Sequence, residues 1–332
     1  MCTSSPNYLS TPDFLKLSLT IISGFSTPIY LLGVYCILLK TPKPMESVKW
    51  YLLVHHVWVV LLDYTVCLLT VPFILFPAIA WVPFGVLKEV GVPTVVQNVM
   101  MLVVIQYLGI STVSIYENRF FILCEFGFKE RWEVLRRFWL LAHYLVSLLS
   151  FIPVIMLIPD QETAKESIFP VLPCLPFPLH KKVFVLAIDL HFHIIGATIG
   201  SIFLCSEALF FIFWMTRNSL NQLRTHKVSL TTYKMQKQFF LALLVQTTIP
   251  FFMLVIPLCI IGLMVVFKYS NQGLCNVGLI IVATQGFWST LVMLMVHRPY
   301  RLAVKAVITR GDDRVKEKKA SIGMTRRSTV IL

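Results

Sequence analysis

The chain has 332 residues, of which 57% are hydrophobic and only 14% are charged. That composition excludes a soluble globular domain, because the solvated surface of such a domain raises the charged share to about 25%. The formal net charge is +13, so the position of the positive charge along the chain becomes informative. These values together indicate a membrane protein.

Seven apolar segments are long enough to cross a bilayer, which takes about 20 residues of α-helix. Lipid cannot satisfy free backbone polar groups, so each segment is expected to be helical. In chain order the predicted spans are Leu17–Leu39, Trp50–Phe76, Pro93–Phe121, Phe138–Ile158, Val183–Met215, Gln238–Phe267 and Cys275–Val296. The sequence therefore predicts an all-α membrane protein, a bundle of seven transmembrane helices over residues 17–296.

Lysine and arginine gather in alternate connections between these spans. The connections after the first, third and fifth spans, together with the C-terminal segment, hold 23 of the 29 Lys and Arg residues, and the rest of the chain holds 6. Cytoplasmic loops are enriched in these residues, so we expect the N-terminus outside and the C-terminus in the cytoplasm. The positive charge then favours anionic membrane lipid as a partner, and nucleic acid is not expected.

The segments that flank the bundle are short. Residues 1–16 are predicted to form a small extracellular N-terminus. Within residues 297–310, basic side chains recur at helical spacing, at Arg298, Arg301 and Lys305, and apolar residues occupy the other side. This pattern is typical of an amphipathic helix along the membrane. Residues 311–332 are polar and charged, so a disordered cytoplasmic tail is expected there.

Three acidic residues fall within the predicted spans, where an ionisable side chain is costly and is a functional candidate by default. Asp63 lies near the middle of the second span, at a depth of roughly 20 Å from Trp50. It is expected to be either a hydrated cation site or polar switch, or a protonated packing residue. Asp189 lies near the outer end of the fifth span and Glu207 near its inner end.

A set of polar residues is predicted to line a small-molecule pocket in the outer half of the bundle. Asp189 and His193 are four residues apart and so share a helix face. Amide side chains and one tryptophan lie between the outer third and the middle of other spans, and are expected to converge with that pair. The full set is Gln97, Gln106, Asp189, His193, Gln246, Gln285 and Trp288. The alternative is that the amides form hydrogen bonds between helices and that the Asp–His pair caps the bundle.

Several short motifs together resemble the nematode serpentine chemoreceptors of class H. They are Val48–Trp50, Leu61–Asp63, Ser114–Phe120 (SIYENRF), Leu172–Pro176 (LPCLP) and His297–Arg301 (HRPYR). The resemblance covers nearly the whole chain. It implies a seven-helix G-protein-coupled receptor in the plasma membrane of a sensory neuron, with the cilium as its expected location. A small environmental molecule and a heterotrimeric G protein are the implied partners.

Two of these motifs border the cytoplasm and are the candidate G-protein coupling residues. Arg119 and Glu207 reach similar depths on different spans, so we expect them to pair at rest and to separate on activation. The alternative is that Arg119 extends to lipid phosphates. The full coupling set is Glu117, Asn118, Arg119, Glu207, His297, Arg298, Pro299, Tyr300 and Arg301.

Two further features concern motion and covalent links. Pro250 and Pro257 each remove a backbone hydrogen bond from the sixth span, which favours a kink; the pair is either a hinge or a static bend. Cys174 and Cys275 border the outside, where they form either a disulfide or two free thiols. The spacing of Cys and His predicts no metal site, and no cofactor motif is present.

Three other classes of membrane protein fit the sequence less well. A small transporter needs a continuous polar path and usually has internal repeats, which this chain lacks. A seven-span ligand-gated channel of the insect odorant-receptor type has its N-terminus inside, against the charge distribution. A membrane enzyme needs acids that converge at one depth, whereas Asp63, Asp189 and Glu207 are staggered. A non-enzymatic receptor is therefore the function we expect.

Overall fold

The computed structural model describes residues 7–75, 78–124, 126–170, 182–189, 191–225, 229–267, 269, 271–307 and 309. The main elements in chain order are α1 (Pro12–Lys40), α2 (Glu46–Tyr64), the π-helical η3 (Thr65–Thr70), β1 (Pro72–Leu75), β2 (Ile79–Pro83), α3 (Val86–Glu89), α4 (Thr94–Leu123), α5 (Lys129–Leu149), α6 (Phe151–Met156), α7 (Gln161–Ile168), β3 (Phe184–Ala187), α9 (His191–Arg224), α10 (Leu230–Val266), α11 (Gln272–Ala283) and α12 (Gln285–Val296). Two short 3-10 helices, η1 (Tyr8–Ser10) and η2 (Lys43–Met45), precede α1 and α2.

Seven helices among the described residues are long and apolar enough to cross a membrane, which confirms the predicted seven-helix bundle. Helices α2 and η3 form one span, as do α5 and α6, and α11 and α12. The buried residues of α1, such as Leu15, Leu19 and Ile37, recur at helical spacing, whereas Phe25 is 73% exposed. Large apolar side chains on the outer surface are what a helix facing lipid requires.

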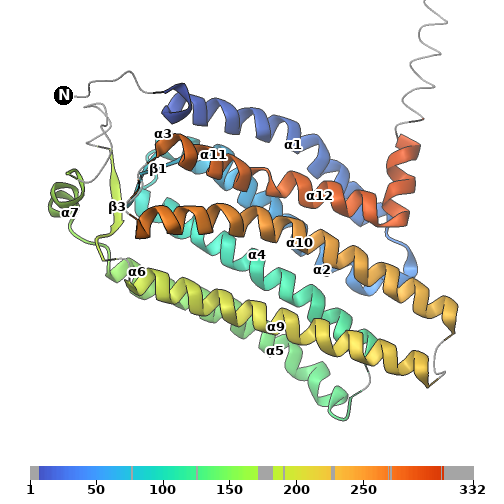
Figure 1. Ribbon diagram of the computed structural model, residues 1–332. Helices are drawn as coiled ribbons and strands as arrows, with labels where there is room; N and C mark the ends of the chain where they lie inside the picture. Colours follow the sequence, from blue (N-terminus) through green and yellow to red (C-terminus); the bar gives the residue numbers. More distant parts are fainter. Residues whose placement is uncertain are drawn as a thin grey trace, which may run out of the picture.

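The long helices lie side by side, with the strands and the start of α1 at one end and the helix that follows α12 at the other (Figure 1). We call these the sheet end and the tail end. Helix α4 lies centrally, packed against α2, α5 and α9; α1 packs against α2 and α12, and α10 against α11 and α12. A side chain near the tail end of α4 is therefore enclosed by helices on several sides.

The first span begins earlier than predicted, at Pro12 instead of Leu17. The hydroxyl of Thr11 accepts a hydrogen bond from the Phe14 N–H, and proline is well tolerated at the first helical position. The predicted N-terminal segment 1–16 therefore contains the first turn of α1.

A three-stranded antiparallel sheet at the sheet end was not predicted. β1 pairs with β2, so that Phe73 lies opposite Val82, and β2 pairs with β3. The second span consequently ends at Thr70 and does not reach Phe76. Val71 has a φ of 42°, in the left-handed region that ends a helix, and Pro72 cannot donate the next helical hydrogen bond.

The chain after β2 closes the end of η3. The N–H groups of Phe84 and Gly85 donate to the Thr70 carbonyl at 3.1 and 2.9 Å, which satisfies a group that the helix end leaves free. A Cβ at position 85 would overlap the backbone of Leu69, so this close approach requires glycine.

The fifth span begins at His191 and not at Val183, because residues 184–187 form β3. Asp189 therefore precedes α9 instead of lying within it. Its exposed carboxylate accepts a hydrogen bond from the His191 N–H at 2.9 Å. Sequence patterning could not separate a short apolar strand from the start of an apolar helix.

Helix α10 runs without interruption through Pro250 and Pro257, so the hinge at these residues stays a prediction. The seventh span instead breaks at Thr284, between α11 and α12. At the tail end, residues 298–307 are helical, within the predicted 297–310. The predicted tail 311–332 and Cys174 lie outside the described residues, and Cys275 is buried as a free thiol.

Candidate functional site

The tail half of α4 carries a run of buried polar residues. Glu117, Asn118 and Arg119 are only 2%, 3% and 7% exposed. Because α2, α5 and α9 enclose this part of α4, these side chains cannot rely on water. A buried charge is tolerated only when it is paired or hydrogen-bonded, so the partners of each residue define what it can do.

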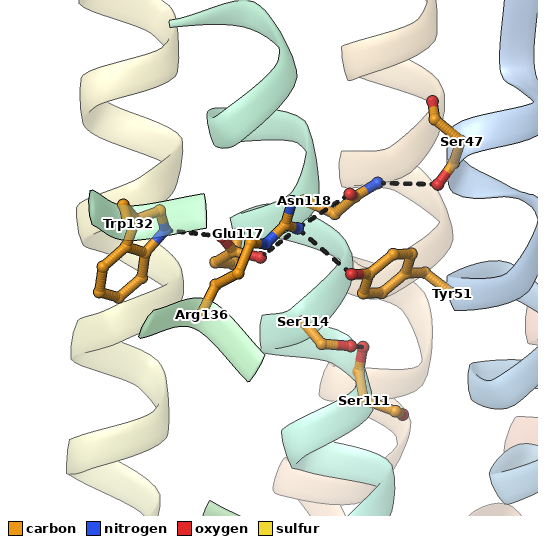
Figure 2. Close-up of polar contacts among 8 residues, drawn as sticks. All are labelled: Ser47, Tyr51, Ser111, Ser114, Glu117, Asn118, Trp132 and Arg136. Carbon is orange, nitrogen blue, oxygen red and sulfur yellow. Dashed lines mark hydrogen bonds and ion pairs between the residues drawn. The ribbon is translucent and has the colours of Figure 1, made fainter. Parts of the chain in front are cut away.

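Glu117 is paired with two side chains of α5 (Figure 2). Its Oε2 lies 2.7 Å from Nη2 of Arg136, and its Oε1 accepts a hydrogen bond from Trp132 Nε1 at 2.8 Å. The Arg136 side chain is itself only 13% exposed. Glu117 is thus held inside the bundle by an ion pair that joins α4 to α5.

The same arginine also reaches α2. Arg136 Nη2 donates to the Asn118 Oδ1 at 3.0 Å and to the Tyr51 hydroxyl at 3.2 Å, while the Asn118 amide donates to the Ser47 carbonyl. Its guanidinium also lies 4.3 Å from the centre of the Phe121 ring, a favourable cation–π distance. Figure 2 shows Tyr51, Glu117 and Asn118 converging on Arg136. We call Tyr51, Glu117, Asn118, Trp132 and Arg136 the arginine cluster.

Sequence reasoning missed this cluster, although α5 carried a signal for it. Five residues of α5 form side-chain hydrogen bonds to α4 or α9. They stand four, three, four and four positions apart, which places them on one helix face. They are Trp132, Arg136, Trp139, His143 and Ser147. A stripe of aromatic and ionisable residues in a membrane-spanning helix predicts contacts inside the bundle.

The predicted Arg119–Glu207 pair was wrong. Glu207 Oε2 lies 2.9 Å from His143 Nε2, and its Oε1 accepts from Trp139 Nε1 at 3.4 Å. His143 Nδ1 faces the Trp139 carbonyl at 2.8 Å and so carries a hydrogen. The contact between Nε2 and Oε2 therefore needs a second proton, on one partner or the other. Depth matched Glu207 to Arg119, but α5 lies beside α9 and supplies nearer donors.

Arg119 belongs to a different group of residues. Its charge acts on His297 and Tyr300, which follow α12. The Tyr300 hydroxyl is 2.8 Å from the Thr41 hydroxyl after α1, and His297 Nε2 is 3.4 Å from Gln246 Oε1 on α10. Burial, followed by the charge of Arg119, lowers the pKa of His297 to about 4. We call Arg119, Gln246, His297 and Tyr300 the histidine cluster.

The predicted pocket amides do not converge. Gln97 donates to the Val92 carbonyl at 2.9 Å, which fastens the first turn of α4. Gln106 accepts a hydrogen bond from Ser147 and so links α4 to α5, and Gln246 lies in the histidine cluster. Gln285 is buried at the start of α12. The alternative, hydrogen bonds between helices, therefore holds for Gln106 and Gln246.

Of the other predicted pocket residues, two are exposed and one is half-buried. Asp189 is exposed before α9, and Trp288 is 42% exposed on α12. His193 is half-buried in the first turn of α9. The charge and the backbone of Asp189 act on His193, so these two residues remain neighbours although the helix starts only at His191.

Asp63 is 2% exposed and accepts a short hydrogen bond from the Tyr30 hydroxyl on α1. The Tyr30 carbonyl lies 3.2 Å from His56 Nε2, and a Cβ on Gly286 would overlap the Tyr30 hydroxyl. Asp63 thus lies where α1, α2 and α12 meet. Among the described residues, no group of three or more His, Cys, Asp or Glu side chains is placed to hold a metal ion.

A hollow of about 270 Å³ lies between α10 and α11, toward the sheet end. All the side chains that line it are apolar, and Pro257 and Gly278 form part of its wall. None of the predicted pocket residues lines it. Any molecule held there would meet hydrocarbon surfaces and no hydrogen-bonding partner.

Seven apolar helices around a buried polar centre define a multi-pass membrane protein of the seven-helix receptor class. The sequence model of the serpentine-type seven-transmembrane GPCR chemoreceptor family Srh matches residues 10–310. The chain is also 25% identical over 326 residues to serpentine receptor class H-72 of Caenorhabditis elegans, covering 95% of this chain and 91% of that protein. The chain therefore belongs to the Srh family of serpentine chemoreceptors, a receptor family and not an enzyme family.

Proposed function

We propose that this chain is a chemosensory receptor that binds a small environmental molecule and activates a heterotrimeric G protein. Family membership and the seven-helix bundle support the receptor class. The observation that carries the coupling proposal is the histidine cluster. The charge of Arg119, near the end of α4, acts on His297 and Tyr300 after α12, and His297 lies beside Gln246 on α10. Among the residues that the structure describes, no contact favours a transporter or a channel instead.

The proposed orientation has the sheet end outside and the tail end in the cytoplasm. The unequal distribution of Lys and Arg supports it. An epitope tag fused at Met1 should be reached by antibody on intact cells, and a tag at Leu332 should be reached only after permeabilisation. The reverse pattern would overturn the coupling proposal as well, since the histidine cluster would then face the outside.

We infer that Arg119 transmits activation. A shift of α10 relative to α12 would break the contact between Gln246 and His297 and open the space around Arg119 to a cytoplasmic partner, a two-state rearrangement of the kind that couples sites. Arg119→Ala should abolish a G-protein reporter response while surface expression is preserved. Arg131→Ala, which removes an exposed arginine of α5, is the matched control and should respond like wild type.

The hollow between α10 and α11 is our candidate ligand site, and its lining favours an apolar molecule. A dry apolar cavity of about 150 Å³ binds benzene, so 270 Å³ accommodates a somewhat larger hydrocarbon-like compound. Binding beside Pro257 would change the packing of α10 on α11, and a ligand must prefer one packing in order to signal.

Calcium imaging of cells that express this chain, against a panel of apolar and polar odorants, tests the ligand proposal. Gly278→Leu would fill the hollow, since the neighbouring Pro257 lies 3.7 Å from the position of a Cβ there. Gly262→Leu is the control, because no atom lies within 4 Å of its Cβ position. A response that survives Gly278→Leu would exclude this hollow as the ligand site.

The proposed location is the plasma membrane, and within it the cilium of a sensory neuron, as the family resemblance implies. A fluorescent fusion expressed from the native promoter tests this. Fluorescence confined to internal membranes of non-neuronal cells would contradict the location.

A further inference from the structure

We propose that the tail end of the bundle holds a binding site for one anionic phospholipid, between α1 and the short helix at 298–307. A pocket of about 210 Å³ lies there, lined by Tyr35, Lys40, Pro299, Ala303, Ala306 and Val307. Nothing in the proposed signalling role assigns this pocket. The phosphate would bind at Lys40, and an acyl chain would cover the apolar floor.

Both walls of the pocket are fixed by the core. Tyr300 is 0% exposed, and its hydroxyl bonds to the Thr41 hydroxyl directly after α1. Tyr300 and Ala303 pack in one cluster with Cys36 and Ile37 of α1 and Met293 of α12. The short helix therefore cannot slide along α1 without losing this packing, and the pocket keeps its shape when empty.

The chemistry of the lining matches a phospholipid. The Lys40 ammonium lies 5.5 Å from the centre of the Tyr35 ring, a cation–π contact that holds the charge at the rim. Ala303 and Ala306 leave room above the floor, and none of the described residues that line the pocket is acidic. Arg298, Arg301 and Lys305 are exposed on the same short helix and add positive charge nearby. The site thus combines one positioned cation with an apolar channel.

The surroundings favour lipid over a soluble phosphate compound. Leu39 is 69% exposed beside Lys40, and Leu302 and Val307 are 56% and 48% exposed on the short helix. These apolar side chains need a hydrocarbon environment, which places Lys40 at the level where the membrane-spanning part of α1 ends. Juxtamembrane cations at that level attract anionic headgroups. A soluble phosphate compound would leave the apolar floor uncovered.

The test uses the full chain purified in neutral detergent, with short-chain phosphatidylserine as the probe and native mass spectrometry and thermal unfolding as readouts. We expect saturable binding of one lipid that raises the unfolding temperature. Lys40→Gln should weaken binding about fivefold, the effect of one lost cation near a membrane surface. Ala306→Leu should exclude the acyl chain. Lys40→Arg should restore binding, and Arg131→Gln, an exposed cation elsewhere on the tail end, should leave it unchanged.

Three results would overturn the proposal. Equal binding of short-chain phosphatidylcholine would remove the role of headgroup charge, and equal binding of glycerophosphoserine would show a phosphate site without a lipid channel. Wild-type affinity in both Lys40→Gln and Ala306→Leu would exclude this pocket. If Ala306→Leu fails to fold, Val307→Trp at the edge of the pocket replaces it. These readouts do not depend on signalling, so they stand apart from the proposed function.

Discussion

Glu117 and Arg119 are two residues apart on α4, yet they belong to different networks. Glu117 is bound into the arginine cluster, whose members come from α2, α4 and α5. Arg119 lies with the histidine cluster, which involves α10 and the segment after α12. Because residues two apart point to opposite sides of a helix, one short motif serves two purposes. We infer that the first cluster holds the bundle together and the second couples it to a partner.

The largest effect is expected from breaking the arginine cluster on one side. Arg136→Met leaves the Glu117 carboxylate buried and unpaired, which should cost about 3–5 kcal/mol of unfolding free energy. Adding Glu117→Gln should recover part of the loss. Equilibrium unfolding in mixed micelles measures both, with Arg131→Met on the exposed side of α5 as the control. If the two changes were simply additive, Glu117 and Arg136 would not be energetically coupled.

A smaller effect on stability is expected from the histidine cluster, and it depends on pH. The pKa of His297 is about 4 in the folded protein, against an ordinary 6.5, so the unfolded chain takes up a proton that the folded protein does not. Above pH 6.5 this difference in pKa does not affect the free energy of unfolding. As the pH falls from 6.5 toward 4, the free energy of unfolding decreases, by about 3 kcal/mol in total.

Unfolding between pH 7 and pH 4 measures this term. His297→Gln keeps a hydrogen-bonding side chain near Gln246 but cannot titrate, so its stability should fall less steeply with acid. Identical slopes for the two proteins would show that His297 is not protected from protonation.

The smallest stability effect concerns Asp63. In Gly286→Ala the added methyl group would overlap the Tyr30 hydroxyl that donates to Asp63, and overpacking of this kind costs about 1–3 kcal/mol. Gly24→Ala on α1 is the control, because no atom lies within 4 Å of its Cβ position. Equal unfolding temperatures for the two variants would mean that the packing of α1 against α12 adjusts to the added methyl group with no loss of stability.

The parts of the fold that follow from composition could be predicted from sequence. Lipid imposes helices on long apolar segments, so seven spans were correct even where their ends were not. The sheet was missed because Val183–Ala187 is an apolar run that fits a strand and a helix equally. The end of η3 depends on Val71 and on Gly85, whose tertiary contact no local pattern reveals.

The candidate site shows a similar division. Burial of Asp63 and of the motif around Arg119 was expected, but their partners were not. Glu207 and Arg119 match in depth, yet partner choice depends on which face of α9 meets α5. The stripe from Trp132 to Ser147 could have indicated this, since its periodicity is visible in the sequence. By contrast, the location of Gln246 beside His297 depends on the packing of α10 against α12.

The most direct test of the difference between the two clusters is a nucleotide-exchange assay. It measures how fast a purified heterotrimeric G protein exchanges nucleotide in the presence of the reconstituted receptor. We expect the wild type to accelerate exchange, the Glu117→Gln/Arg136→Met double variant to retain activity in its folded fraction, and Arg119→Ala to lose it while folding normally. Full exchange activity in Arg119→Ala would contradict the assignment of coupling to the histidine cluster.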